Sequence, residues 1–130
     1  MRKVYLAGGF KSRWQDLVQN RTTSFEFIDP SLHNIENPSD YTEWDLRAID
    51  QSDIIFAYME DTNPGGYALA LEVGYAKASN KKIIFVTEKN MGKRLRYFDM
   101  VKAVSDQYYT NLEDAIDGLN NLATLEERIL

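Results

Sequence analysis

The most constraining feature of the sequence is a glycine-containing turn placed between two apolar runs. The segment Asn63–Ala76 reads NPGGYALALEVGYA and separates Ile54–Met59 from Ile83–Val86. Its first half predicts a turn, and its second half, rich in small apolar residues, predicts a helix. A strand that leads through a glycine turn into a helix often binds a ligand, because backbone N–H groups face outward at the helix start. Glu72, a lone acid on this predicted helix, is therefore a candidate functional residue.

Strands and helices are expected to alternate along the whole chain. The predicted helices are Trp14–Asn20, Asp40–Asp50, the second half of Asn63–Ala76, Asn90–Val104 and a final helix that follows Asn111. The predicted strands are Lys3–Ala7, Ser24–Ile28, Asp53–Met59, Ile83–Thr87 and Gln107–Thr110. This alternation predicts an α/β fold: a three-layer, doubly wound, five-stranded parallel sheet, flavodoxin- or Rossmann-like, with strand order 2-1-3-4-5. A length of 130 residues predicts a single domain over residues 1–130.

Local signals set two of the expected boundaries. Ser31–Asp40 is polar and contains Pro38, so it is expected to be a loop, and Asp40 with Glu43 predicts a capping box at the start of the next helix. The predicted helix Asn90–Val104 carries an apolar, partly aromatic face that suits either the core or a subunit interface. That face consists of Tyr97, Phe98, Met100 and Val101.

With this strand order, the ligand crevice is expected beyond the carboxyl ends of the first and third strands. The loop Gly8–Phe10 would then lie beside Asn63–Gly66, with Glu72, Asp45 and Tyr5 converging on the crevice. A carboxylate held by a phenol and a second acid suits a nucleophile or a general base at a sugar carbon. Each residue also has a plainer interpretation: a half-exposed helix glutamate, a solvated helix aspartate and a core tyrosine with its hydroxyl at the rim.

Composition argues against several other classes of protein. The net charge is −5 and the basic residues are scattered, which argues against binding to a nucleic-acid polymer. Cysteine is absent and His33, the only histidine, lies in a polar loop and is interpreted as a surface residue, so a transition-metal site is not expected. No apolar run is long enough for a signal peptide or a membrane span, and the cytosol is the expected location.

Three segments occur in an order that resembles a known family. They read VYLAGG, WDLRAIDQSDIIFAY and LEVGYAKASNKKIIFV, and together they span roughly Lys3 to Val86. The chain resembles the nucleoside 2-deoxyribosyltransferase family, which also contains the deoxynucleoside 5′-monophosphate N-glycosidases. Gly66 stands where that family usually has an acid or a serine, and Asp61 and Asn63 are possible substitutes further back in the loop.

The resemblance implies a role for each candidate residue. Glu72 would attack C1′ of the sugar, Asp45 would position the sugar and handle protons at the base, and Tyr5 would contact the nucleophile. The resemblance implies a nucleoside or nucleotide as the small-molecule substrate, no cofactor, and a homo-oligomer in which a neighbouring subunit completes each site. The expected substrate-binding residues are Gly8, Gly9, Phe10, Lys11, Asn63, Gly65 and Gly66, with Lys11 similar in placement to a phosphate-binding residue.

Several alternatives remain open at the level of the sequence. The segment PGGYALALE is also similar to the P-G-G-x-G-T-x-x-E loop of the lysine-decarboxylase-like phosphoribohydrolases, although Ala68 and Leu69 replace its G-T pair. A non-catalytic nucleotide-binding module, or a partner-binding domain without a pocket, would also be compatible with the pattern. The sequence likewise leaves open the base, the choice of nucleoside or nucleotide, and transfer or hydrolysis.

Overall fold

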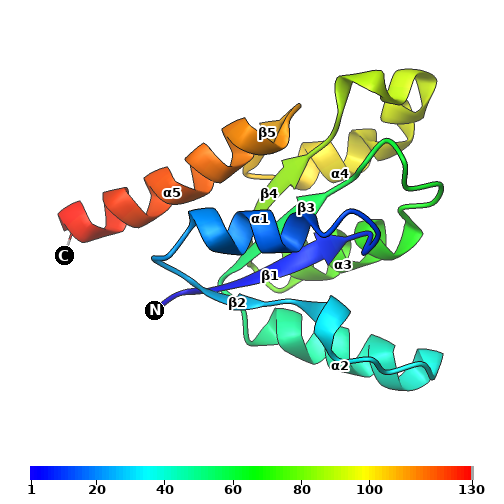
Figure 1. Ribbon diagram of the computed structural model, residues 1–130, viewed down its shortest axis with the longest axis horizontal. Helices are drawn as coiled ribbons and strands as arrows, with labels where there is room; N and C mark the ends of the chain where they lie inside the picture. Colours follow the sequence, from blue (N-terminus) through cyan, green and yellow to red (C-terminus); the bar gives the residue numbers. More distant parts are fainter. Residues whose placement is uncertain (130) are drawn as a thin grey trace.

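The computed structural model describes residues 1–129, and a five-stranded parallel sheet forms its centre (Figure 1). The order β2-β1-β3-β4-β5 confirms the predicted fold and strand order. Both ladders beside the central strand β3 are in register, so Tyr5 pairs with Ile55 and Ile55 with Ile83. The strands are β1 (Lys3–Gly8), β2 (Glu26–Ile28), β3 (Ile54–Tyr58), β4 (Lys82–Val86) and β5 (Gln107–Tyr109).

Helices cover both faces of the sheet, as right-handed crossovers between parallel strands require. One face carries α1 (Trp14–Arg21) and α5 (Leu112–Ile129). The other carries α2 (Pro38–Asp50), α3 (Tyr67–Ala78) and α4 (Asp99–Val104) (Figure 1). Two 3₁₀ segments, η1 (Pro30–Leu32) and η2 (Lys89–Phe98), follow β2 and β4. None of the helices within residues 1–129 has the length and apolarity needed to cross a bilayer.

The strands divide their side chains between two apolar layers. Successive side chains of a strand point to opposite faces, so Val4 and Leu6 join one layer while Tyr5 and Ala7 join the other. We call the first the α1–α5 layer, which includes Trp14, Val18, Phe56, Ile116 and Leu119. The second is the α2–α4 layer, which includes Ile49, Ile55, Val73, Phe85 and Phe98.

The start of α2 differs from the prediction. The helix begins at Pro38, and its N-cap is Asn37, whose side chain accepts a hydrogen bond from the backbone N–H of Asp40. Proline is well suited to the first helical position, because its fixed φ matches the helix and its missing N–H would have no partner there. The predicted capping box of Asp40 and Glu43 was therefore wrong, and Pro38 begins the helix instead of belonging to a loop.

The segment after β4 also differs from the prediction of one helix over Asn90–Val104. Gly92 has φ 60° and ψ −130°, which is outside the helical region and kinks the chain within η2. A separate helix, α4, begins only at Asp99. The predicted apolar face is divided accordingly: Phe98 and Val101 belong to the core, whereas Tyr97 and Met100 are exposed.

Candidate active site

A cleft of about 400 Å³ lies beyond the carboxyl ends of β1 and β3, at the switch point of the sheet. The loops that follow these strands form two of its walls, and α2 and α3 contribute side chains from the α2–α4 layer. Its lining combines apolar and aromatic residues with a few polar groups, as ligand sites usually do. The residues are Tyr5, Gly8, Gly9, Phe10, Pro30, His33, Ile35, Tyr41, Asp45, Asn63, Gly66, Ala68, Leu69 and Glu72.

Glu72 forms the buried polar centre of this cleft. It projects from the second turn of α3 and is only 8% exposed. The hydroxyl of Tyr5 donates a hydrogen bond to Glu72 Oε2. Tyr5 lies in the middle of β1, on the face that packs against α3, and the rest of its side chain is fully buried. The strand pleat therefore fixes the phenol against the carboxyl group.

Burial dominates the electrostatics of this pair. It raises the pKa of Glu72 to about 8; the hydrogen bond from Tyr5 opposes this rise and the charge of Asp45 adds to it. Burial, followed by the charge of Glu72, also raises the pKa of Tyr5, so the hydroxyl stays protonated and acts as the donor. Without a ligand, burial thus favours the protonated form of Glu72.

Asp45 has a partner that the sequence did not indicate. His33 Nε2 lies 3.2 Å from Asp45 Oδ1, and both side chains line the cleft. The backbone N–H of Ile35 donates to His33 Nδ1 at 3.0 Å. A backbone N–H can only donate, so Nδ1 is the acceptor and the ring proton of the neutral imidazole sits on Nε2, directed at Asp45.

His33 is also held by packing. Its ring meets the Trp44 ring edge-on, with centroids 4.6 Å apart. Burial raises the pKa of Asp45, and the hydrogen bond from His33 opposes that rise. The interpretation of His33 as a surface residue was therefore wrong. The only sequence signal for it was its place after β2, whose carboxyl end lies next to the switch point.

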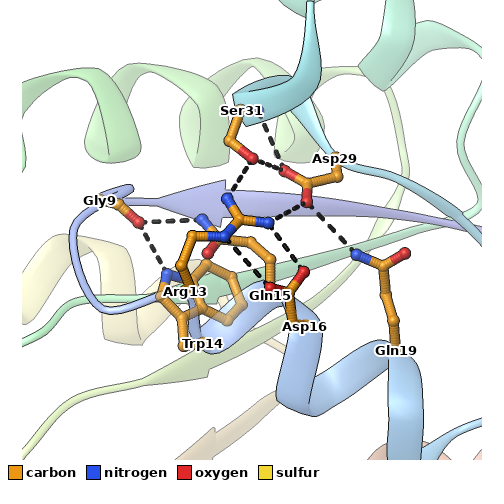
Figure 2. A network of polar contacts seen from close by, with 8 residues as sticks. All are labelled: Gly9, Arg13, Trp14, Gln15, Asp16, Gln19, Asp29 and Ser31. Carbon is orange, nitrogen blue, oxygen red and sulfur yellow. Dashed lines mark hydrogen bonds and ion pairs between the residues drawn. The ribbon is translucent and has the colours of Figure 1, made fainter.

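A network of polar contacts surrounds the buried Asp29, in the segment that leads to His33 (Figure 2). Asp29, at the end of β2, accepts hydrogen bonds from the backbone N–H and the hydroxyl of Ser31. Arg13, before α1, contacts the same carboxylate at 3.3 Å and donates to the Ser31 hydroxyl at 2.6 Å. Since Arg13 and Ser31 come from different crossover connections, the network ties the loop after β1 to the segment after β2.

Two side chains at the start of α1, directly after Arg13, hold the carbonyl group of Gly9. Trp14 Nε1 and Gln15 Nε2 both donate to it at 2.9 Å (Figure 2). Before it, Gly8 has φ 150°, and a Cβ there would lie 2.5 Å from the carbonyl oxygen of Tyr58. Only glycine fits at this close approach of β1 and β3, so the loop of Gly8 to Phe10 leaves the sheet along one defined path.

The turn after β3 is held by hydrogen bonds to its backbone and by a glycine. Arg94 from η2 donates to the carbonyl oxygens of Asp61 and Asn63. Asn63 Oδ1 accepts from the N–H of Gly65, so the NH₂ group of Asn63 remains available at the cleft.

Gly66 has φ 96°, and a Cβ there would lie 2.7 Å from Met59 Sδ. This glycine allows α3 to start directly over the sheet, which places Glu72 in the cleft.

The structure brings most of the predicted site residues together. Tyr5, Asp45 and Glu72 share the cleft with the predicted binding residues Gly8, Gly9, Phe10, Asn63 and Gly66. Two predicted residues lie elsewhere: Gly65 supports the turn, and Lys11 lines a neighbouring chamber together with Glu60. Besides His33, the cleft residues that sequence reasoning missed are Pro30, Ile35, Tyr41, Ala68 and Leu69, and those it missed in the neighbouring chamber are Glu60, Thr62 and Pro64.

Fold and site together define an α/β protein with a buried carboxyl group in a switch-point cleft. Comparison with protein families identifies the particular family: the model described as "Nucleoside 2-deoxyribosyltransferase like" matches residues 1–90. The chain belongs to this family. Comparison with curated proteins gives no match.

Two solved structures share the fold. The structure of a CMP N-glycosidase from Clostridium botulinum, BcmB, has a TM-score of 0.62 and 23% identity, and the match covers 92% of this chain and 98% of that one. A conserved protein from Enterococcus faecalis V583 has a TM-score of 0.54 and 17% identity, with 94% and 87% of the two chains covered. At such low identity these matches support the fold.

Proposed function

We propose that this protein breaks the N-glycosidic bond of a nucleoside or nucleoside 5′-monophosphate, with Glu72 as the nucleophile and water or a second base as the acceptor. The observation that carries the proposal is the buried Glu72 carboxyl group, held by the Tyr5 hydroxyl inside a cleft that also contains Asp45. Glycosyl transfer passes through an oxocarbenium-like state that a nearby carboxylate stabilises. Membership of the nucleoside 2-deoxyribosyltransferase-like family, and the fold shared with the CMP N-glycosidase BcmB, support the same chemistry.

The geometry suggests how a substrate is oriented. The Tyr5 hydroxyl is hydrogen-bonded to Glu72 Oε2, so Glu72 Oε1 is the oxygen that approaches C1′. Tyr41 lies one helical turn before Asp45 on α2, and with Ile35 it gives that end of the cleft a flat, apolar character. This end suits the base, so Asp45 would lie beside the bond that breaks, and the sugar would extend toward Gly9 and Asn63.

Glu72 and Asp45 then have different roles in the reaction, as nucleophile and as acid. In the productive state the proton of the pair lies on Asp45 and Glu72 is ionised. Glu72 Oε1 bonds to C1′ while the C1′–N bond breaks, its electron pair leaves with the base, and Asp45 supplies the proton that the base takes up. Water then attacks C1′ and gives a proton to Asp45, and the bond from C1′ to Glu72 breaks. Both carboxyl groups return to their starting states. With a second base in place of water, the reaction is a transfer.

His33 acts in this scheme as a positioning residue. Its fixed tautomer directs a hydrogen bond at Asp45 Oδ1, so the other carboxyl oxygen of Asp45 remains free to meet the substrate. Without a ligand, burial favours the proton on Glu72, and the hydrogen bond from His33 partly offsets the rise in the pKa of Asp45. In this scheme the proton therefore passes from Glu72 to Asp45 when the substrate binds, before Glu72 attacks.

An assay for release and exchange of bases tests the proposal. The protein is incubated with the four common 2′-deoxynucleosides and their 5′-monophosphates, with and without free adenine or cytosine, and the bases are followed by chromatography. Base release or exchange is expected in the wild type. Glu72→Gln, whose amide oxygen can still accept from Tyr5, should lose at least roughly 10³-fold in kcat/KM.

Glu43→Gln is the matched control, because Glu43 is an exposed carboxylate on α2 that pairs with Arg47 outside the cleft. It should retain wild-type turnover. Full turnover in Glu72→Gln would refute the role of Glu72. Thermal stabilisation of the wild type by these ligands, without any product on prolonged incubation, would instead indicate a non-catalytic nucleotide-binding module.

A further inference from the structure

A small side chamber adjoins the cleft between the loops that follow β1 and β3. Its volume is about 90 Å³, and it shares Gly9, Phe10 and Asn63 with the cleft. Lys11 and Glu60 provide the charged groups of its wall. The chamber wall includes none of His33, Ile35 and Tyr41, the residues at the base end of the cleft, so a ligand bound at Glu72 with its base toward His33 would direct its opposite end here.

Glu60 is a buried carboxylate that the proposed chemistry does not use. It lies two residues beyond the end of β3 and is only 6% exposed. The hydroxyl of Ser12 donates to its Oε1. Its Oε2 lies 3.5 Å from the position of a Cβ on Gly9 and has no hydrogen-bond partner in the described part of the chain. A buried carboxylate with a free oxygen at a chamber wall is suited to accept a hydrogen bond from a ligand.

The nearby arginines leave this charge uncompensated. Arg13 is engaged by Asp16, Asp29 and Ser31, and Arg94 is engaged by the carbonyl groups of the turn after β3. Lys11 lines the same chamber and forms no ion pair with residues whose side chains the structure describes, but it is exposed, so solvent screens its charge more than that of the buried Glu60. A phosphate dianion in the chamber would meet the Glu60 carboxylate at short range, whereas a hydroxyl group would donate to it.

We propose that the chamber binds the free 5′-hydroxyl end of a nucleoside and that Glu60 selects nucleosides against their 5′-monophosphates. The O5′–H group donates to Glu60 Oε2, and the phosphate of a nucleotide is repelled by the same carboxylate. This inference rests on the proposed function, which places C1′ beside Glu72. It narrows the substrate class to the uncharged nucleoside and makes Glu60 a specificity-determining residue.

The test measures binding separately from turnover. Dissociation constants of 2′-deoxycytidine, 2′-deoxyadenosine and their 5′-monophosphates are determined by calorimetry in the Glu72→Gln background at low ionic strength, where charge effects are least screened. The nucleoside should bind at least about tenfold more tightly than its monophosphate, a difference of about 1.4 kcal/mol. Adding Glu60→Gln, which can still accept from Ser12, should reduce that ratio by at least about tenfold, mainly through tighter binding of the monophosphate.

Two controls isolate the position of the charge. Ser12→Ala keeps the Glu60 carboxylate, so the nucleoside preference should persist. Asp61→Asn removes one charge from the adjacent residue, which does not line the chamber, and should change the ratio by no more than about twofold. An equal effect of Asp61→Asn and Glu60→Gln would overturn the inference, because general charge would then explain both.

The preference between nucleoside and monophosphate, measured with Glu60 unchanged, also tests the inference. Tighter binding of the monophosphate in the Glu72→Gln background, or a higher kcat/KM for it in the wild type, would overturn the inference and leave the proposed function intact. Absence of binding by every ligand would refute the proposed function and, with it, the assignment of Glu60.

Discussion

The two faces of the sheet are built from the same strands but differ in what they bury. In the α1–α5 layer, strand residues such as Leu6 and Phe56 meet Trp14, Ile116 and Leu119 in closely packed apolar contact. In the α2–α4 layer, the strand position between Val4 and Leu6 is Tyr5, and its partner on α3 is Glu72. The first layer therefore consists mainly of apolar packing, with Trp14 also holding the carbonyl of Gly9, whereas the second contains a buried polar pair.

This difference follows from where the cleft opens. The connection from β1 leads to α1 on one face of the sheet and that from β3 leads to α3 on the other, and side chains of α2 and α3 line the cleft at the end of the sheet. A carboxyl group there is buried by the protein yet accessible to a ligand. Its pKa of about 8 reflects the energetic penalty of ionising it without a ligand. The comparison therefore predicts that stability and function can be altered separately in the two layers.

Leu119→Ala should have the largest effect on stability. Leu119 is fully buried in the α1–α5 layer, and truncating such a leucine to alanine leaves a cavity and lowers the free energy of unfolding by about 2–5 kcal/mol. Urea denaturation measures this loss. The kcat/KM per folded molecule should stay within about twofold of the wild type, because none of the described residues that line the cleft belongs to α1 or α5. A collapse of activity in the folded fraction would show that the two layers are not separable.

Glu72→Gln should have the opposite effect on stability, and its size should depend on pH. The pKa of Glu72 is about 8 in the folded protein, against 4.5 for an ordinary solvated glutamate. Unfolding therefore releases a proton between these values, and the free energy of unfolding falls as the pH rises through this window. Glutamine lacks this dependence. The variant should match the wild type near pH 4.5 and exceed its stability by on the order of 4 kcal/mol at pH 8.

Denaturant titrations of both proteins from pH 4.5 to pH 9 measure this difference. The other titrating groups are common to both proteins, so the difference between the two curves isolates Glu72. A constant difference across the range would contradict a raised pKa for Glu72. A variant that is less stable at pH 8 would show that the ionised carboxylate stabilises the fold, contrary to the contrast drawn between the two layers.

The same contrast explains which features could be predicted from the sequence. Apolar runs and their spacing determined the strands, and the strand order then placed Tyr5 and Glu72 in one crevice. The alternation of side chains along a strand and the handedness of the crossovers place these residues. Both follow from local backbone geometry, so the sequence pattern is enough to predict them. The capping error at Asn37 and the kink at Gly92 arose because single residues changed the backbone locally.

His33 and Glu60 escaped prediction for a different physical reason. Each becomes interpretable only through a contact distant in the chain: His33 with Asp45, and Glu60 with Ser12, 48 positions away. A histidine in a polar loop carries no periodic signal, and a glutamate just past a strand resembles an ordinary solvated residue. Their burial depends on the path of the loops after β1 and β2, which the glycine and arginine contacts set.

The smallest predicted effect concerns the contact between His33 and Asp45. It tests whether a second polar pair on the cleft side of the sheet controls the ionisation of a carboxyl group. The hydrogen bond from His33 lowers the pKa of Asp45 against the effect of burial. His33→Phe keeps a ring against Trp44 but removes the donor, so Asp45 should take up a proton at higher pH. The acid limb of the kcat/KM profile should therefore move to higher pH, and the ratio of activity at pH 5 to that at pH 7 should fall by up to about tenfold. His33→Gln retains an N–H donor and should restore the wild-type profile. If both variants lose activity equally at all pH values, His33 serves packing only and does not influence the ionisation of Asp45.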